Sequence, residues 1–379
     1  MRFFSIIAIP FFSAILISCK IIRPVYYNLP DEKDAIRFPY RTVIQSPDSA
    51  IFNFKRATDI PAIINHIRIE NKSINATGVT INEFVKLHKT ISFAIIRNDS
   101  LLYEYYADNY SATRNVTSFS IAKAYITMLV GIAIDEGYIK SVNDPVTQYI
   151  NEWKDKPGYN LITIKDLLRH TSGLKFTENM FNPKSDQFQF YYGNTLRKNI
   201  LASAIREPPG LHFDYHSENP SLLALIIERT TGTTVSNYLQ QKIWRQIGTE
   251  APALWSTDRK DSAAIEKAFC CLNARTLDFA KFARLLLNKG TWNGKQVIPG
   301  RWIEESINRT TENGGKISYG YNMGIGPVAY NSFFPIGLYG QLLYIYPKKN
   351  IIIVRFGNAD INYHPNYWKE IMIQLIDQL

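Results

Sequence analysis

The chain has 379 residues, of which 46% are hydrophobic and 20% charged, so it holds enough apolar side chains for a large core and is not intrinsically disordered. Its formal net charge is +10, but the 43 lysine and arginine residues are scattered and form neither a stripe nor a tail. This distribution argues against a nucleic-acid partner.

Residues 1–19 predict an export signal. Arg2 precedes a mostly apolar run that ends at Cys19, and the run has the length of a signal peptide rather than of a membrane span. The closing Leu-Ile-Ser-Cys resembles the lipobox of bacterial lipoproteins, which implies that Cys19 is lipidated after cleavage. We therefore expect an exported protein that a lipid anchor holds to a membrane of the bacterial cell envelope, on its periplasmic or its surface side. A plain secretory signal with a chance cysteine is the alternative.

Residues 20–85 predict a tether that becomes an extended N-terminal arm, because they are rich in Pro, Asn and Asp and lack a sustained apolar period. One short helix is expected near 82–88. The pattern changes at residue 86, and 86–379 is predicted to be the folded domain. Its first elements are strands at 91–96 and 101–106, which flank a short polar turn and indicate a hairpin.

The remaining elements follow in chain order. Apolar residues at helical spacing predict helices at 120–137, 164–169, 222–230, 235–247 and 277–288. Strands are predicted at 341–346 and 351–356, and an amphipathic helix at 364–379 closes the chain. Strands at both ends with helices between them predict an α/β (α+β) fold, in which both ends of the chain build one antiparallel sheet that is flanked by helices, with an inserted helical lobe.

Ser120 and Lys123 are the first candidate catalytic pair. They stand three residues apart at the start of the helix predicted at 120–137, so their side chains share one face. A serine hydroxyl needs a neighbouring base to become a nucleophile, and a lysine buried among residues such as Ile121 and Tyr125 has a lowered pKa that suits this task. The positive end of the helix favours a developing alkoxide. The alternative is a lysine whose charged end reaches water.

Further motifs follow Ser120 in a fixed order. They are an acidic turn at 135–145, a segment at 164–174 that ends in His-Thr-Ser-Gly-Leu, the Tyr215-His-Ser217 motif, an apolar helix that stops at Gly232, and a helix at 277–290. This order resembles the serine β-lactamase and penicillin-binding-protein superfamily, specifically the class C β-lactamase-related hydrolases. The resemblance covers about residues 86–379 and implies a β-lactamase/transpeptidase-like fold.

The resemblance also implies roles for single residues. Ser120 matches the acylated nucleophile, Lys123 its partner, and Tyr215 the tyrosine that transfers protons to the leaving group. Ser217 stands where the Tyr-x-Asn motif has asparagine, and it is expected to contact the substrate. A Tyr-x-Ser version is similar to the esterase and nylon-oligomer (aminohexanoate-dimer) hydrolase branches. A tyrosine that is only a core aromatic is the alternative for Tyr215.

The third motif of the family falls on Leu338-Tyr339-Gly340. Gly340 fits the pattern, whereas Leu338 replaces a basic residue that helps to hold a substrate carboxylate, which argues against penicillin-like substrates. Tyr339 and Gly340 are expected to contact the substrate. The backbone N–H groups of Ser120 and Gln341 are expected to form the oxyanion hole.

Histidines and cysteines do not predict a metal site. His170 is interpreted as a turn residue. His212 and His216, although four residues apart, follow Pro-Pro-Gly and have no glutamate between them, unlike a zincin. Cys270 and Cys271 are neighbours, which rarely bridge, so no disulfide is expected and both are interpreted as packing residues. The chemistry requires no metal and no cofactor.

The sequence therefore predicts an exported serine hydrolase that cleaves an ester or amide bond of a small or oligomeric substrate through an acyl-enzyme on Ser120. Two alternatives stay open. The first is β-lactamase or D-alanyl-D-alanine peptidase activity, and the second is a catalytically silent lipoprotein that binds cell-wall material. No Gly-x-Ser-x-Gly motif occurs, which disfavours a Ser-His-Asp hydrolase.

Overall fold

The computed structural model describes residues 29–31, 33–57, 61–71, 76–358 and 365–379. The predicted signal peptide, with the predicted lipidation site Cys19, lies outside these residues, as does the first part of the predicted tether. None of the described helices combines the length and the apolar composition that a membrane span requires.

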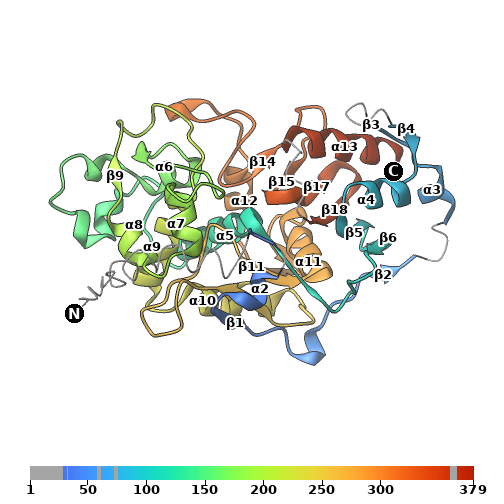
Figure 1. Ribbon diagram of the computed structural model, residues 1–379, viewed down its shortest axis with the longest axis horizontal. Coiled ribbons are helices and arrows are strands. Elements are labelled where there is room, and N and C mark those ends of the chain that lie inside the picture. Colours follow the sequence, from blue (N-terminus) through green and yellow to red (C-terminus); the bar gives the residue numbers. More distant parts are fainter. Residues whose placement is uncertain (1–28, 32, 58–60, 72–75, 359–364) are drawn as a thin grey trace, which may run out of the picture.

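Strands from both ends of the folded chain share one sheet, as predicted (Figure 1). In spatial order these strands are β14 (Gly324–Ile325), β15 (Phe333–Phe334), β17 (Gln341–Tyr346), β18 (Ile351–Gly357), β5 (Thr90–Arg97), β6 (Ser100–Tyr106) and β2 (Lys55–Arg56), with β16 (Ile336–Gly337) paired to β17. β18 pairs antiparallel with β5, where Ile353 lies opposite Ile95. The predicted hairpin is β5 and β6, and the predicted C-terminal strands are β17 and β18.

The central strands of this sheet are buried on both faces. Because successive residues of a strand point to opposite faces, Ala94 of β5 belongs to the larger apolar core and Ile95 to a second core. α11 (Thr276–Leu287) packs against β17 and β18, whereas α4 (Ile81–Leu87) and α13 (Pro365–Gln378) contribute to the second core. Burial on both faces explains why these strands are apolar throughout and do not alternate with polar residues.

The inserted helical lobe forms as predicted. Its helices are α5 (Ala122–Asp135), α6 (Ile164–Arg169), α7 (Asp186–Tyr192), α8 (Leu196–Leu201), α9 (Glu218–Thr231) and α10 (Val235–Lys242). α5 packs against α9 and α10 and is buried over its first three turns, as its apolar sequence requires. Gly131 of α5 contacts Trp302 of α12 (Gly300–Ser306) so closely that an added Cβ would lie 2.2 Å from the Trp302 ring. This contact helps to fix the position of α5.

A second sheet supports the start of α5 and was not predicted. Its strands are β1 (Tyr40–Val43), β10 (Ala253–Ser256), β11 (Leu272–Arg275) and β7 (Asn115–Thr117), in that order. β1 comes from the segment predicted to be an extended arm, and it pairs with β10. The expected boundary at residue 86 falls inside α4, which Thr80 and Glu83 cap at its start. The described part of the arm therefore belongs to the fold.

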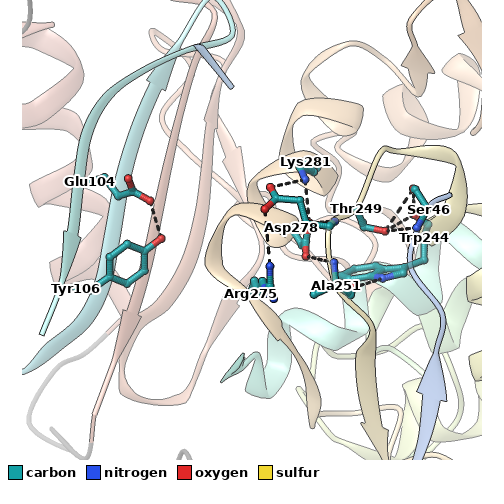
Figure 2. Close-up of polar contacts among 10 residues, drawn as sticks. Ser46, Glu104, Tyr106, Trp244, Thr249, Ala251, Arg275, Asp278 and Lys281 are labelled. Atoms are coloured by element: carbon teal, nitrogen blue, oxygen red, sulfur yellow. Dashed lines mark hydrogen bonds and ion pairs between the residues drawn. The ribbon is translucent and has the colours of Figure 1, made fainter. Parts of the chain in front are cut away.

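Polar contacts hold this arm against the body of the protein (Figure 2). The backbone N–H of Ser46 donates to the Thr249 hydroxyl at 3.1 Å. Close by, the Asp278 carboxylate accepts a hydrogen bond from the Ala251 N–H and pairs with the fully buried Lys281. Because the pair is hydrogen-bonded on both sides, its charges are compensated in the interior.

Short elements complete the fold. They are α2 (Asp34–Arg37), α3 (Pro61–His66), the ribbon of β3 (Ile69–Asn71) and β4 (Ala76–Val79), the ribbon of β8 (Leu174–Lys175) and β9 (Ala204–Ile205), and the ribbon of β12 (Thr291–Trp292) and β13 (Lys295–Gln296).

Candidate active site

Ser120 lies in a single 3₁₀ turn, Phe119–Ile121, between β7 and α5. The segment before it is tied to β11, because the N–H of Ser118 donates to the Leu272 carbonyl and the Leu272 N–H donates to the Ser118 hydroxyl. Phe119 has a φ of 43°, a left-handed conformation that costs free energy for a residue with a side chain. The sheet therefore holds this turn in a strained form that leaves Ser120 partly exposed at a cleft.

Lys123 contacts the nucleophile directly. Its Nζ donates to the Ser120 Oγ at 2.9 Å and to the Phe269 carbonyl at 2.8 Å, and the residue is 1% exposed. Burial lowers the pKa of Lys123 to about 8, although the nearby charge of Glu178 acts in the opposite direction. A lysine with this pKa is partly neutral near pH 8 and can accept the proton of Ser120.

Tyr215 completes the predicted triad. The Lys123 Nζ lies 4.9 Å from the centroid of the Tyr215 ring, and that ring stacks on His170. Burial of its hydroxyl, together with the charge of Glu178, raises the pKa of Tyr215, while its hydrogen bond with Ser120 lowers it. Tyr215 is therefore a neutral phenol near neutral pH and can donate a proton. The structure brings Ser120, Lys123 and Tyr215 together.

Ser217 contacts Glu178 and is fully buried, so it does not face the cleft. Both its N–H and its hydroxyl donate to the Glu178 carboxylate at 2.7 Å, and Gln187 donates to the same carboxylate at 2.7 Å. Glu178 itself lines the cleft. Sequence reasoning missed Glu178. The serine of Tyr-x-Ser indicated a hydroxyl that needs a partner, but no local pattern indicated which residue supplies the acceptor.

His170 is a structural residue, as interpreted from the sequence. It has a φ of 59° and ends α6. Its Nε2 lies 2.8 Å from the Asn322 amide oxygen, and its Nδ1 lies 3.2 Å from the His216 N–H, which donates to it. Burial lowers the pKa of His170 well below its usual range, so the ring is neutral and supports the face of Tyr215.

The strand beside the nucleophile is β16, and its glycine is Gly337. An added Cβ at Gly337 would lie 2.6 Å from the Ser118 carbonyl oxygen and 3.1 Å from the Ser120 nitrogen, so the strand approaches the catalytic turn as closely as a glycine permits. Gly340, which was predicted for this place, also lines the cleft, but an added Cβ there would meet Trp368 and Arg355 instead of the catalytic turn. The structure therefore shifts the predicted third motif by three residues.

Gln341 does not present a free N–H to the cleft. Its N–H donates to the Leu338 carbonyl and closes the turn Leu338–Gly340, and its side chain exchanges two hydrogen bonds with Gly357. The residue is 2% exposed. Leu338, the first residue after β16, lines the cleft. The hydrogen bond of Gln341 does not fit the oxyanion role predicted for it.

Tyr339, which is predicted to contact the substrate, lines the cleft, but its hydroxyl turns away from Ser120. It donates to the Pro30 carbonyl at 2.8 Å, while the ring meets Phe119 edge to face. The N-terminal arm therefore supports this wall of the cleft.

Cys270 and Cys271 form a disulfide, and the prediction of two unbridged cysteines was wrong. Cys271 has a φ of 70°, a left-handed conformation that residues with a side chain adopt uncommonly. Cys270 lines the cleft, and both residues are 1% exposed. The disulfide directly follows Phe269, whose carbonyl accepts from Lys123.

The cleft has a volume of about 740 Å³ and a largely apolar, aromatic lining. This size suits a ligand of a few dozen atoms or fewer. Its walls include Met180, Phe181, Phe213, Tyr319, Phe334 and Ile336. Ser120 and Glu178 supply polar groups at the wall, and Lys316 supplies a cation.

The chain is similar to several known proteins. The chain matches the family model described as Beta-lactamase over residues 81–371. It is 23% identical to the 6-aminohexanoate-dimer hydrolase of Paenarthrobacter ureafaciens over 299 residues, which are 71% of this chain and 72% of that protein. Among solved structures, it is similar to the "Putative 6-aminohexanoate-dimer hydrolase" from Bacillus anthracis, with a TM-score of 0.77, 25% identity and 90% of both chains covered. The octameric penicillin-binding protein homologue of Pyrococcus abyssi shares the fold, with a TM-score of 0.56, 19% identity, and 78% of this chain and 75% of that one covered.

Proposed function

We propose that this chain, which belongs to the beta-lactamase family, cleaves an ester or amide bond through an acyl-enzyme on Ser120. The observation that carries the proposal is the 2.9 Å contact between the Lys123 Nζ and the Ser120 Oγ at the wall of an open cleft. A hydroxyl that a buried amine can deprotonate is an activated nucleophile.

Each residue then has one task. Neutral Lys123 takes the proton of Ser120 while the Oγ attacks the carbonyl carbon of the substrate. The oxyanion of the tetrahedral intermediate accepts hydrogen bonds from the N–H groups of Ser120 and Leu338. The phenol of Tyr215 protonates the departing alcohol or amine, and the C–O or C–N bond breaks. Water then attacks the acyl-enzyme and gives a proton to the Tyr215 phenolate. Protonated Lys123 returns its proton to the Ser120 Oγ as the acyl C–O bond breaks, so the acid leaves and all three groups regain their starting state.

The substrate class follows from the strand beside the nucleophile. Pro335, Ile336 and Gly337 carry no cation there, and neither does Leu338, so this strand offers no partner for a substrate carboxylate next to the scissile bond. The aromatic lining favours an apolar acyl or leaving group. One relative is named 6-aminohexanoate-dimer hydrolase and a similar solved structure "Putative 6-aminohexanoate-dimer hydrolase", which supports an ester or a linear amide over a penicillin-like substrate.

The experiment that tests the proposal is active-site labelling. Wild-type protein is treated with a fluorophosphonate probe, and the labelled residue is identified by peptide mass spectrometry. We expect labelling at Ser120 and none in Ser120→Ala. Hydrolysis of short-chain esters, linear amide dimers and nitrocefin, compared in the same two proteins, then ranks the substrate classes. A folded wild-type protein that the probe does not label would favour a binding protein without catalysis.

We also propose that residues 1–19 direct export and that Cys19 carries the lipid anchor. The proposal is supported by the apolar run and the closing Leu-Ile-Ser-Cys of that segment. Cys19→Ala is expected to move the protein from the membrane fraction of the producing bacterium to the soluble fraction. Unchanged membrane association would contradict the anchor.

A further inference from the structure

Glu178 is an acidic residue that the mechanism above does not use, although it lies at the catalytic centre. It belongs to the loop before α7 and reaches the wall of the cleft. Its carboxylate accepts both hydrogen-bond donors of Ser217 and one from Gln187. Three donors on one carboxylate form a fixed arrangement, because each hydrogen bond to a charged group is strong.

This arrangement fixes the backbone that carries Tyr215. Ser217 is two residues from Tyr215, and the Ser217 N–H is bound at 2.7 Å, so the carboxylate holds the main chain as well as the side chain. The neighbouring N–H of His216 is bound by His170. Glu178 thus occupies the hydrogen-bonding groups of the serine in the Tyr-x-Ser motif, and that serine does not reach the substrate.

Glu178 also acts on the catalytic groups through its charge. It opposes the effect of burial on Lys123 and raises the pKa of Tyr215. Burial raises the pKa of Glu178 above its usual range, although Lys123 and the hydrogen bonds from Ser217 act in the opposite direction. The other titratable groups that act on Glu178 or Lys123 are His170 at the end of α6, Asp214 in the loop before α9, Glu218 at the start of α9, and Tyr319.

We propose that Glu178 is a positioning residue of this active site: its carboxylate holds the Tyr215-His216-Ser217 segment in place, and its negative charge sets the pH at which Ser120 is activated. The inference rests on the proposed function and assigns a task to a residue outside the Ser120, Lys123 and Tyr215 triad. Its charge acts in the same direction on Lys123 and on Tyr215, so the expected shift does not depend on which of them is the main base.

The test measures the rate of Ser120 labelling by the fluorophosphonate probe between pH 5.5 and 10, which requires no knowledge of the natural substrate. In wild-type protein the rate is expected to rise with pH through a midpoint near 8, where Lys123 loses its proton. Glu178→Gln removes the charge and one of the two acceptor oxygens. We expect its midpoint to move to lower pH and its maximal rate to fall about tenfold.

Three further variants separate the two effects. Glu178→Asp keeps the charge, so its midpoint is expected to stay near that of the wild type while its maximal rate falls. Ser217→Ala removes one donor and is expected to lower the maximal rate. Glu304→Gln is the matched control, because it removes a carboxylate from the exposed pair with Lys289, which does not line the cleft, and it is expected to change neither quantity.

The outcomes distinguish this inference from the function on which it rests. No labelling of the wild type would overturn the proposed function itself. Normal wild-type labelling with an unchanged or raised midpoint in folded Glu178→Gln would overturn the inference alone. If Glu178→Gln does not fold, a wild-type rate in Ser217→Ala would overturn the positioning role, and a wild-type rate in Glu178→Asp would do the same.

Discussion

The two walls of the cleft are held in place by different kinds of contact. On the helical wall, Ser120 and Lys123 lie within one turn of the same chain segment, so the backbone alone brings them within 2.9 Å. On the strand wall, Gly337 reaches Ser120 only because β16 pairs with β17 and the sheet carries both to the start of α5. The first wall depends on local spacing, and the second depends on tertiary contacts.

This difference decides what a single substitution does. A substitution of Ser120 or Lys123 on the helical wall removes a reacting group and leaves the fold intact. The Lys123 Nζ, for example, donates only to the Ser120 Oγ and the Phe269 carbonyl among the described residues. A substitution on the strand wall changes the distance between β16 and the turn that carries Ser120. Its effect on the reaction rate depends on whether Gly337 or Gly340 is the glycine that contacts this turn. Three experiments test this contrast.

The largest effect is expected for Lys123→Met. Loss of the base is expected to lower the hydrolysis or labelling rate about 10³-fold. The same substitution is expected to raise the stability of the folded protein. The pKa of Lys123 falls from 10.5 to about 8 on folding, so the buried charge destabilises the folded state below pH 8, and this penalty vanishes above pH 10.5. The melting temperature of Lys123→Met is therefore expected to exceed that of the wild type at pH 7, with a gain that shrinks toward pH 10.5.

Lys281→Met is the matched control for this prediction. Lys281 is equally buried, but it pairs with Asp278 and Glu250 away from the cleft. Its removal leaves buried Asp278 without its closest cation, so the melting temperature is expected to fall while the rate per folded molecule stays constant. A stability loss in Lys123→Met like that in Lys281→Met would show that Lys123 is a structural cation and not a base.

The second prediction compares the two glycines of the strand wall. Gly337→Ala is expected to push β16 away from Ser120 and to lower the rate about 10²-fold, the effect of losing one oxyanion donor. Gly340→Ala is expected to cost about 1–3 kcal/mol or more of stability, because Gly340 has a φ of 74° and an added Cβ would overlap Trp368, with a smaller effect on the rate per folded molecule. The measurements are labelling rate and melting temperature.

The reverse result would restore the assignment made from the sequence. If Gly340→Ala abolished labelling in a folded protein while Gly337→Ala left it unchanged, then the oxyanion donor would follow Gly340 and would be Gln341. The structure argues against this, because the Gln341 N–H already donates to the Leu338 carbonyl.

The same contrast explains which features of the structure could be predicted from the sequence. The shared sheet, the helical lobe and the pairing of Ser120 with Lys123 follow from apolar periodicity and local spacing, and all three were predicted. The register of the strand wall was not, because Gly337 and Gly340 stand in similar apolar surroundings and only pairing with β17 distinguishes them. The second sheet was missed for a related reason: β1 is a short strand of mixed burial, and its partner β10 lies far away in the sequence.

The role of Glu178 and the disulfide could not be predicted from local sequence patterns. The acceptor for Ser217 comes from a loop whose course no periodicity defines. The bridge between Cys270 and Cys271 requires an unusual backbone at Cys271, which depends on the surrounding contacts: the Cys270 N–H donates to the Lys267 carbonyl, and the Cys271 carbonyl accepts from Ser256. Both features arise from tertiary structure, and each became apparent only with its neighbours in place.

The smallest effect is expected from this disulfide. It closes a ring between adjacent residues, so it restricts the unfolded chain little, and its loss is expected to change the melting temperature only slightly. Its position beside Phe269 suggests a local effect, because the Phe269 carbonyl helps to hold Lys123. Dithiothreitol supplies two electrons and two protons, becomes a cyclic disulfide and leaves two thiols. We expect the labelling rate to fall severalfold after this treatment, and the Cys270→Ser, Cys271→Ser double variant to show the lower rate with no further response to the reductant. Alkylation of the unfolded, unreduced protein with iodoacetamide checks the disulfide itself. Modification of both cysteines without reduction would contradict the disulfide, whereas modification only after reduction would confirm it. A confirmed disulfide together with an unchanged labelling rate after reduction would show that it does not influence Lys123.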